Sequence, residues 1–255
     1  MRFLKMHGLG NDFVIFDART EMLALTEADM VEIADRRRGV GCDLITVIEA
    51  SDNADVFVQF FNADGSESGA CGNATRCVAD IVMSETEKDT CTIEVLGGIL
   101  NCRKKGDLMI EVDMGVPKDV NDLDIGRDGV SNPVYVDMGN PHCVFFVDNY
   151  QDISVDELGA HFETHDAFPN RSNVEFIIVQ DRGHVRQKTW ERGCGLTEAC
   201  GSGACAVIAA AVRRGLTDHK VDVELDGGIL HMELREGDGH VLMTGPVAYV
   251  FDGEL

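Results

Sequence analysis

The stretch Ala70-Cys71-Gly72-Asn73-Ala74-Thr75-Arg76-Cys77 has a second version later in the chain, Ala199-Cys200-Gly201-Ser202-Gly203-Ala204-Cys205. The leading cysteines, at positions 71 and 200, are 129 positions apart, and the same spacing carries Gly10-Asn11 onto Gly139-Asn140. At a spacing of 130, Gly97–Leu100 recurs as Gly227–Leu230 and Met114-Gly115 as Thr244-Gly245. Matches in one order at one spacing indicate an internal duplication.

The duplication predicts two homologous domains, at residues 1–117 and 118–245. The remaining tail, 246–255, contains the strand-like segment Val247–Phe251, which we expect to pack back on the N-terminal half.

Each half consists mainly of short β-branched or aromatic segments bounded by Gly, Asp and Asn, the pattern of strands. Thr26-Glu27-Ala28-Asp29 is a capping-box start for a helix, and Ser154 to His165 has a similar pattern. An apolar helical run, Val78–Val82 or Ala206–Val212, follows each duplicated cysteine motif. The predicted class is α+β, with each half a curved, mostly antiparallel sheet around a central helix.

Composition excludes several functions. With 45 acidic and 22 basic residues the formal net charge is -23, which argues against a nucleic-acid surface. The uncharged stretch Ala199–Val212 has 14 residues, short of the roughly 18 that span a bilayer. The N-terminus has no continuous apolar run, so we expect no signal peptide. Without export signals, an odd count of nine cysteines indicates a reducing compartment, so we expect a cytoplasmic protein.

The nine cysteines contain no Cys-x-x-Cys pair, which argues against a zinc, iron–sulfur or thioredoxin-type site, and we expect no metal. Cys71 and Cys200 differ from the others because each lies at the predicted N-terminus of a central helix. The partial positive charge and free N–H groups there lower a thiol pKa and bind carboxylates.

Two acid–base groups of one type suit a reaction that removes a proton from one face of a carbon and returns one to the other. A pseudo-two-fold axis between the halves would place the two thiols across an interdomain cleft, with a small substrate between them. This chemistry is racemisation or epimerisation without a cofactor.

The chain resembles the diaminopimelate epimerases over nearly its whole length. The matching motifs are Met6–Phe13, Asn62–Ser66, Ala70–Asn73 with Arg76-Cys77, Gly139–His142, Asn173-Val174, Glu191–Gly193 and Ala199–Gly203. The resemblance implies interconversion of LL- and meso-2,6-diaminoheptanedioate for lysine and peptidoglycan synthesis, without pyridoxal phosphate. It also implies two pseudo-symmetric units with the active site in the cleft between them, and a homodimer.

By this resemblance Cys71 and Cys200 are the acid–base pair, and His142 and Glu191 orient the reacting centre or set the thiols' protonation. The remaining residues are implied to bind or orient the substrate: the turns Gly72-Asn73 and Gly201-Ser202 hold the reacting carboxylate, and Asn11, Asn62, Asn140, Asn173 and Arg192 contact its polar groups. Arg192 suits the distal carboxylate, because its planar fork binds carboxylates in a bidentate manner.

Each assignment has an alternative. His142 could be a loop histidine, Asn62, Asn140 and Asn173 could stabilise turns, and Glu191-Arg192 could be a solvated ion pair. Leu44 stands where the family usually has Gln. The alternative functions are a two-cysteine racemase of another amino acid, such as proline, hydroxyproline or histidine, and a non-catalytic redox-sensing or ligand-binding relative.

Overall fold

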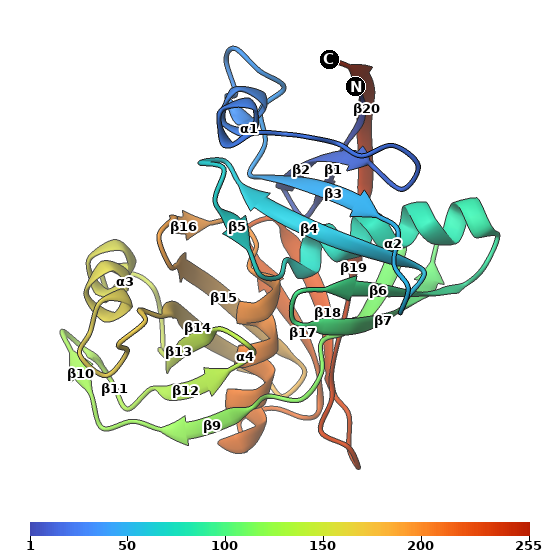
Figure 1. The fold of residues 1–255 in the computed structure, drawn as a ribbon. Helices are drawn as coiled ribbons and strands as arrows, with labels where there is room; N and C mark the ends of the chain where they lie inside the picture. Colours follow the sequence, from blue (N-terminus) through green and yellow to red (C-terminus); the bar gives the residue numbers. More distant parts are fainter. The chain divides into compact units, whose positions relative to one another are not determined.

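The computed structural model describes residues 1–255, which form two compact units (Figure 1). Unit 1 contains Met1–Val112 and Gly245–Leu255, and unit 2 contains Asp113–Thr244. The C-terminal segment therefore returns to the N-terminal unit, where β20 (Ala248–Glu254) pairs antiparallel with β1 (Arg2–Gly8).

Unit 1 is a mixed, mostly antiparallel sheet with two helices. Besides β1 and β20, its elements are β2 (Asn11–Asp17), α1 (Glu27–Ala34), β3 (Leu44–Glu49), β4 (Val56–Asn62), β5 (Glu67–Ser68), α2 (Gly72–Thr86), β6 (Thr90–Val95), β7 (Gly98–Gly106) and β8 (Met109–Asp113). The pairs β2–β3 and β4–β6 are parallel. The central helix α2 packs on β1, β6 and β7, and every residue from Gly72 to Met83 is buried.

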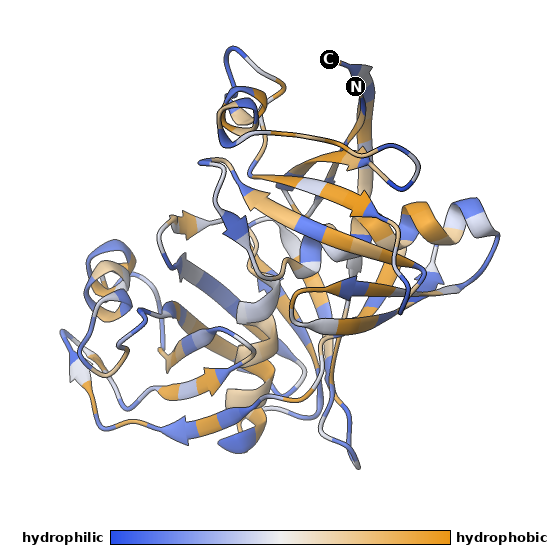
Figure 2. Cartoon of the chain, in the orientation of Figure 1, coloured by the Kyte–Doolittle hydropathy of each residue, from blue (hydrophilic) through white to orange (hydrophobic).

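Unit 2 repeats this plan. Its elements are β9 (Asp119–Asp122), β10 (Gly126–Arg127), β11 (Val130–Ser131), β12 (Val134–Asp137), β13 (Pro141–Phe146), α3 (Val155–Glu163), β14 (Asn173–Asp181), β15 (His184–Glu191), β16 (Gly195–Thr197), α4 (Gly201–Arg213), β17 (Lys220–Leu225), β18 (Gly228–Leu234) and β19 (Val241–Pro246). Here β13–β14 and β15–β17 are the parallel pairs. Helix α4 is central and is mostly Gly, Ala and other small apolar residues (Figure 2).

The strand registers show that the duplication seen in the sequence is also present in the fold. Phe13 lies opposite Leu44 in the parallel pair of unit 1, and His142 lies opposite Asn173 in that of unit 2. Both residues of the second pair are 129 positions beyond those of the first. The predicted α+β class, with mostly antiparallel sheets around a central helix, is confirmed.

Two helix starts show which of the predicted capping patterns form in the structure. Thr26 forms the full capping box with Asp29 before α1, as its sequence predicts. Ser154 occupies the N-cap of α3, but its side chain accepts no capping bond, and the helix ends at Glu163 rather than at His165. No helix combines the length and apolar character that crossing a bilayer requires.

Candidate active site

Each duplicated cysteine is the N-cap residue of its central helix. The Cys71 sulfur accepts a hydrogen bond from the backbone N–H of Ala74 at 3.5 Å, and the Cys200 sulfur accepts one from Gly203 at 3.4 Å. A sulfur in this position contacts the positive end of the helix dipole, which favours the thiolate. The position predicted for both thiols from sequence is therefore found in the structure.

One asparagine side chain forms hydrogen bonds at the start of each central helix. Asn11 Oδ1 accepts hydrogen bonds from Asn73 Nδ2 at 3.2 Å and from the Cys71 thiol at 3.7 Å. In unit 2, Asn140 Nδ2 donates to Ser202 Oγ at 3.3 Å, and this hydroxyl lies 3.7 Å from the Cys200 sulfur. Because these residues are related by the 129-residue spacing, the duplication preserves an asparagine beside each helix start.

His142 is buried in β13 and is not a solvated loop residue. Its Nδ1 lies 2.7 Å from Glu175 Oε1, its Nε2 lies 3.0 Å from Asn140 Oδ1, and neither His142 nor Glu175 is exposed. The imidazole ring is therefore held between the Glu175 carboxyl group and the Asn140 side chain. Asn140 and Ser202 then connect it to Cys200.

The backbone of Gly203 lets this polar cluster approach Cys200. A Cβ atom there would lie 2.8 Å from Glu175 Oε1, 2.9 Å from Gln187 Nε2 and 3.2 Å from the Cys200 sulfur. The equivalent residue in unit 1 is Ala74, the third residue of α2, which carries a side chain at this position. The glycine in the second motif therefore accommodates a buried carboxylate.

Burial and neighbouring charges shift the pKa values of Cys200 and Glu191. At Cys200 the lowered pKa expected from its helix N-terminal position is wrong: burial, together with the negative charges of Glu191 and Glu175, outweighs the hydrogen bond from Gly203 and raises the pKa of the thiol well above its ordinary value. Burial also raises the pKa of Glu191, whose carboxylate accepts a hydrogen bond from Thr197 Oγ1. The structure thus favours a protonated Cys200 beside a carboxyl group that can take up a proton.

Glu191 and Arg192 do not form an ion pair with each other. The Arg192 backbone N–H donates to Asn173 Oδ1 at 2.9 Å, while Asn173 Nδ2 donates to the carbonyl of Pro141 at 3.1 Å. Arg192 is exposed, and its Nη1 donates to the carbonyl of Asn170 at 3.1 Å. The Asn173 side chain therefore fixes the position of the backbone at Arg192.

Asn62 is bonded within its own turn. Its Nδ2 donates to Ser66 Oγ at 2.9 Å, and its backbone N–H donates to the Ser66 carbonyl at 2.8 Å. Leu44 lies directly opposite Asn62 in the β3–β4 pair. The side chain of Asn62 is therefore bonded to Ser66 in its own turn.

Two carboxylates of this region, Glu163 and Glu175, are absent from the residues singled out by sequence. Glu163 accepts a hydrogen bond from the backbone of Gly193 at 2.9 Å, next to Arg192. Glu175 is an acidic residue within the largely apolar strand Asn173–Asp181. A charged residue at a predicted buried position needs a partner, and this could have marked Glu175 as a candidate.

Most of the other thiols are buried, as expected for small apolar residues. Burial raises the pKa of Cys42 to about 11, so that thiol is unreactive near neutral pH. Cys194 is exposed on the turn after Arg192. No group of three or more His, Cys, Asp or Glu side chains is arranged to hold a metal ion.

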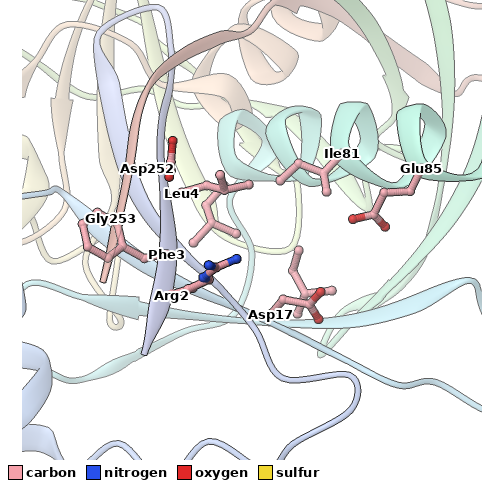
Figure 3. Close-up of a pocket in the computed structure, with 10 residues that line it drawn as sticks. Arg2, Phe3, Leu4, Asp17, Ile81, Glu85, Asp252 and Gly253 are labelled. Atoms are coloured by element: carbon pink, nitrogen blue, oxygen red, sulfur yellow. The ribbon is translucent and has the colours of Figure 1, made fainter. Parts of the chain in front are cut away.

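A cavity of about 230 Å³ in unit 1 contains neither cysteine (Figure 3). Its apolar residues include Leu4 and Ile81, and its charged ones include Arg2, Glu85 and Asp252. Ile81 and Glu85 belong to the C-terminal half of α2, whereas Cys71 precedes the first turn of that helix. This cavity is therefore not the site at Cys71.

Comparison with known proteins identifies the arrangement. The family model "Diaminopimelate epimerase" matches residues 3–120 and 134–250. The chain belongs to the diaminopimelate epimerase family. The diaminopimelate epimerase of Acidiphilium cryptum is 49% identical, over 99% of this chain and 95% of that protein. That of Rhodospirillum centenum is 49% identical, over 100% of this chain and 92% of that protein. Membership of this epimerase family makes the protein an isomerase.

Solved structures share the fold at low sequence identity. A PhzF-family phenazine biosynthesis protein from Bacillus anthracis has a TM-score of 0.76 at 18% identity, covering 100% of this chain and 98% of that one. A hydroxyproline epimerase from Agrobacterium vitis has a TM-score of 0.70 at 15% identity, covering 99% and 91%. The fold of diaminopimelate epimerases is thus shared with proteins of other named activities.

Proposed function

We propose that this protein is a diaminopimelate epimerase that interconverts LL- and meso-2,6-diaminoheptanedioate, in lysine and peptidoglycan precursor synthesis, through Cys71 and Cys200. The observation that carries the proposal is the placement of both thiols as N-caps of duplicated central helices. Membership of the family supports the choice of substrate.

In the proposed mechanism, one cysteine is a thiolate and removes the α-proton, while the other is a thiol and delivers its proton to the opposite face of the same carbon. The thiolate becomes a thiol and the thiol a thiolate, so the reverse reaction uses the exchanged forms. Each thiol would therefore act on one face of the same reacting carbon.

The reacting carboxylate would bind the backbone N–H groups of Gly72-Asn73 and Gly201-Ser202. Such groups at helix N-termini stabilise the negative charge that develops on deprotonation. Arg192 would bind the distal carboxylate, with Asn11, Asn62, Asn140 and Asn173 contacting or orienting other polar groups. His142 and Glu191 would set the protonation of Cys200, since both lie in its polar surroundings.

The test is incubation of the purified, reduced protein with LL-diaminopimelate in deuterated water. The expected product is the meso isomer with deuterium at one α-carbon, formed without added pyridoxal phosphate and with hydroxylamine present. An inert substrate, with racemisation of proline, hydroxyproline or histidine instead, would assign a different substrate. Binding without turnover of any of these amino acids would indicate a non-catalytic relative.

We also propose that the enzyme is a homodimer. Strand β20 exposes Tyr249, Val250 and Phe251, which are 47%, 53% and 50% exposed, and adjacent exposed apolar side chains are typical of interfaces. Light scattering should give twice the mass of one chain. Val250→Lys should reduce this to one chain, whereas a monomeric wild-type protein would contradict the proposal.

A cytoplasmic location is proposed because the chain has nine cysteines, and an odd count is poor evidence for a disulfide framework and is typical of proteins from a reducing compartment. Immunoblots of fractionated cells should detect the protein with cytoplasmic markers, and detection in the periplasm would contradict this.

A further inference from the structure

Glu163, at the end of α3, accepts hydrogen bonds from three donors in two segments of the chain. Its Oε2 accepts from the indole Nε1 of Trp190 at 2.7 Å, and its Oε1 accepts from the backbone N–H of Gly193 at 2.9 Å. Arg171 Nη1 also donates to Oε1, at 3.1 Å. Because Glu163 is only 6% exposed, these donors replace the water that a carboxylate would otherwise bind.

Two of these donors flank the segment that carries Glu191 and Arg192. Trp190 precedes the segment in β15, and Gly193, with φ of +79°, turns the chain after it. The turn closes through a hydrogen bond from the Cys194 backbone N–H to the Glu191 carbonyl at 3.0 Å. Glu163 therefore bonds to the side chain of Trp190, just before Glu191, and to the backbone of Gly193, just after Arg192.

Helix α3 fixes the indole as well as its N–H. A Cβ atom at Gly159 would lie 2.6 Å from Trp190 Cβ and Cγ, so the absence of a side chain there leaves room for the tryptophan. Gly159 and Glu163 are four residues apart and lie on one face of the helix. One helical face therefore provides both the surface on which Trp190 packs and its acceptor.

We propose that Glu163 is a positioning residue that holds Glu191 and Arg192 in the geometry that binds the substrate. The proposal rests on the proposed function of Arg192 as a carboxylate ligand. A carboxylate is required because both of its oxygens accept. Glutamine has one acceptor oxygen, and its NH₂ group would face either the Trp190 or the Gly193 donor.

The first test compares Glu163→Gln with Arg171→Gln. Arg171 donates to the same carboxylate, but its side chain is 58% exposed, so water can replace it. Glu163→Gln should raise KM for LL-diaminopimelate about tenfold or more, because a buried donor loses its acceptor, with a smaller change in kcat. Arg171→Gln should leave KM nearly unchanged. An unchanged KM in Glu163→Gln would overturn the proposal.

A second measurement separates positioning from general stability. Glu163→Gln and Arg192→Lys should have less than additive effects on KM when combined, because the first acts through the second. Full additivity would overturn the proposal. If Glu163→Gln does not fold, Trp190→Phe removes one donor and keeps the carboxylate. It should raise KM with kcat preserved, and an unchanged KM there would also overturn the proposal.

Trp190 is the only tryptophan in the chain, so its fluorescence monitors this contact without turnover. Acrylamide should quench it more strongly in Glu163→Gln than in the wild type or in Arg171→Gln. Equal quenching would overturn the structural part of the proposal. A wild type that does not turn over diaminopimelate, with the expected quenching difference, would instead reject the proposed function.

Discussion

Glu175 and His142 form a buried pair in unit 2 that unit 1 replaces with Thr46 and Phe13. The 129-residue spacing relates both positions, and all four residues are buried. In unit 1 Phe13 lies opposite Leu44, and Thr46 is two positions after Leu44. In unit 2 His142 lies opposite Asn173, and Glu175 is two positions after Asn173. The same backbone therefore accepts an apolar or a polar pair at this place.

This relationship predicts how the pair contributes to stability. Glu175→Ala should lower the free energy of unfolding by about 3–5 kcal/mol, because it leaves His142 buried without its partner. The double variant His142→Phe with Glu175→Thr, which copies unit 1, should recover much of that loss while remaining inactive. Urea unfolding measures both, and a double variant as unstable as the single one would contradict the argument.

The N-cap role of the thiols predicts a separation of stability from activity. Cys71→Ser and Cys200→Ser should keep the stability of the wild type, because a serine hydroxyl is a preferred N-cap acceptor. Cys71→Ala and Cys200→Ala should each lose about 1 kcal/mol of stability.

All four cysteine variants should lose epimerisation of diaminopimelate, because each removes one acid–base group. Thermal unfolding and deuterium incorporation measure the two effects. A serine variant that is as destabilised as the alanine variant would show that the sulfur does not cap the helix.

The carboxylates around Cys200 predict its reactivity. Since burial and two negative charges raise its pKa, alkylation of Cys200 by iodoacetamide should be slow at neutral pH and still be accelerating above pH 9. Glu191→Gln removes one negative charge and should increase the rate severalfold. Peptide mass spectrometry measures the rate at this residue. Glu198→Gln, an exposed neighbour, is the control, and equal rates in both variants would rule out the charge effect.

Asp12 predicts a loss of stability in acid. Burial raises its pKa, but hydrogen bonds from Arg36 and Lys5 outweigh burial and lower it from 3.8 to about 2. A lowered folded-state pKa stabilises the protein above about pH 4, and this contribution, about 2 kcal/mol, is lost as the pH falls toward 2.

Urea unfolding should therefore show Asp12→Asn less stable than the wild type at pH 7, with a smaller difference at pH 3. Asp238→Asn, at an exposed residue paired with Arg235, is the control and should change little. A difference between the wild type and Asp12→Asn that is constant with pH would contradict the assignment.

Part of the site was accessible from sequence because its signals are local or repeated. The position of Cys71 and Cys200 before Gly-rich helix starts depends on a few adjacent residues, and the duplication doubled that signal. The Asn11 and Asn140 contacts follow from the same spacing. Ser154 shows the limit of local patterns, because its capping pattern is present and its side chain caps nothing.

The sequence by itself determined the duplication, the α+β class, the two helix-capping cysteines and the family, since all of these are encoded in adjacent residues or in one constant spacing. Only the tertiary structure decided that His142 pairs with Glu175, that Gly203 makes room for this carboxylate beneath Cys200, and that Glu163 binds both sides of the Glu191-Arg192 segment. These contacts join residues from different strands and helices. Strand register and helix packing bring them together, and no pattern of neighbouring residues specifies them.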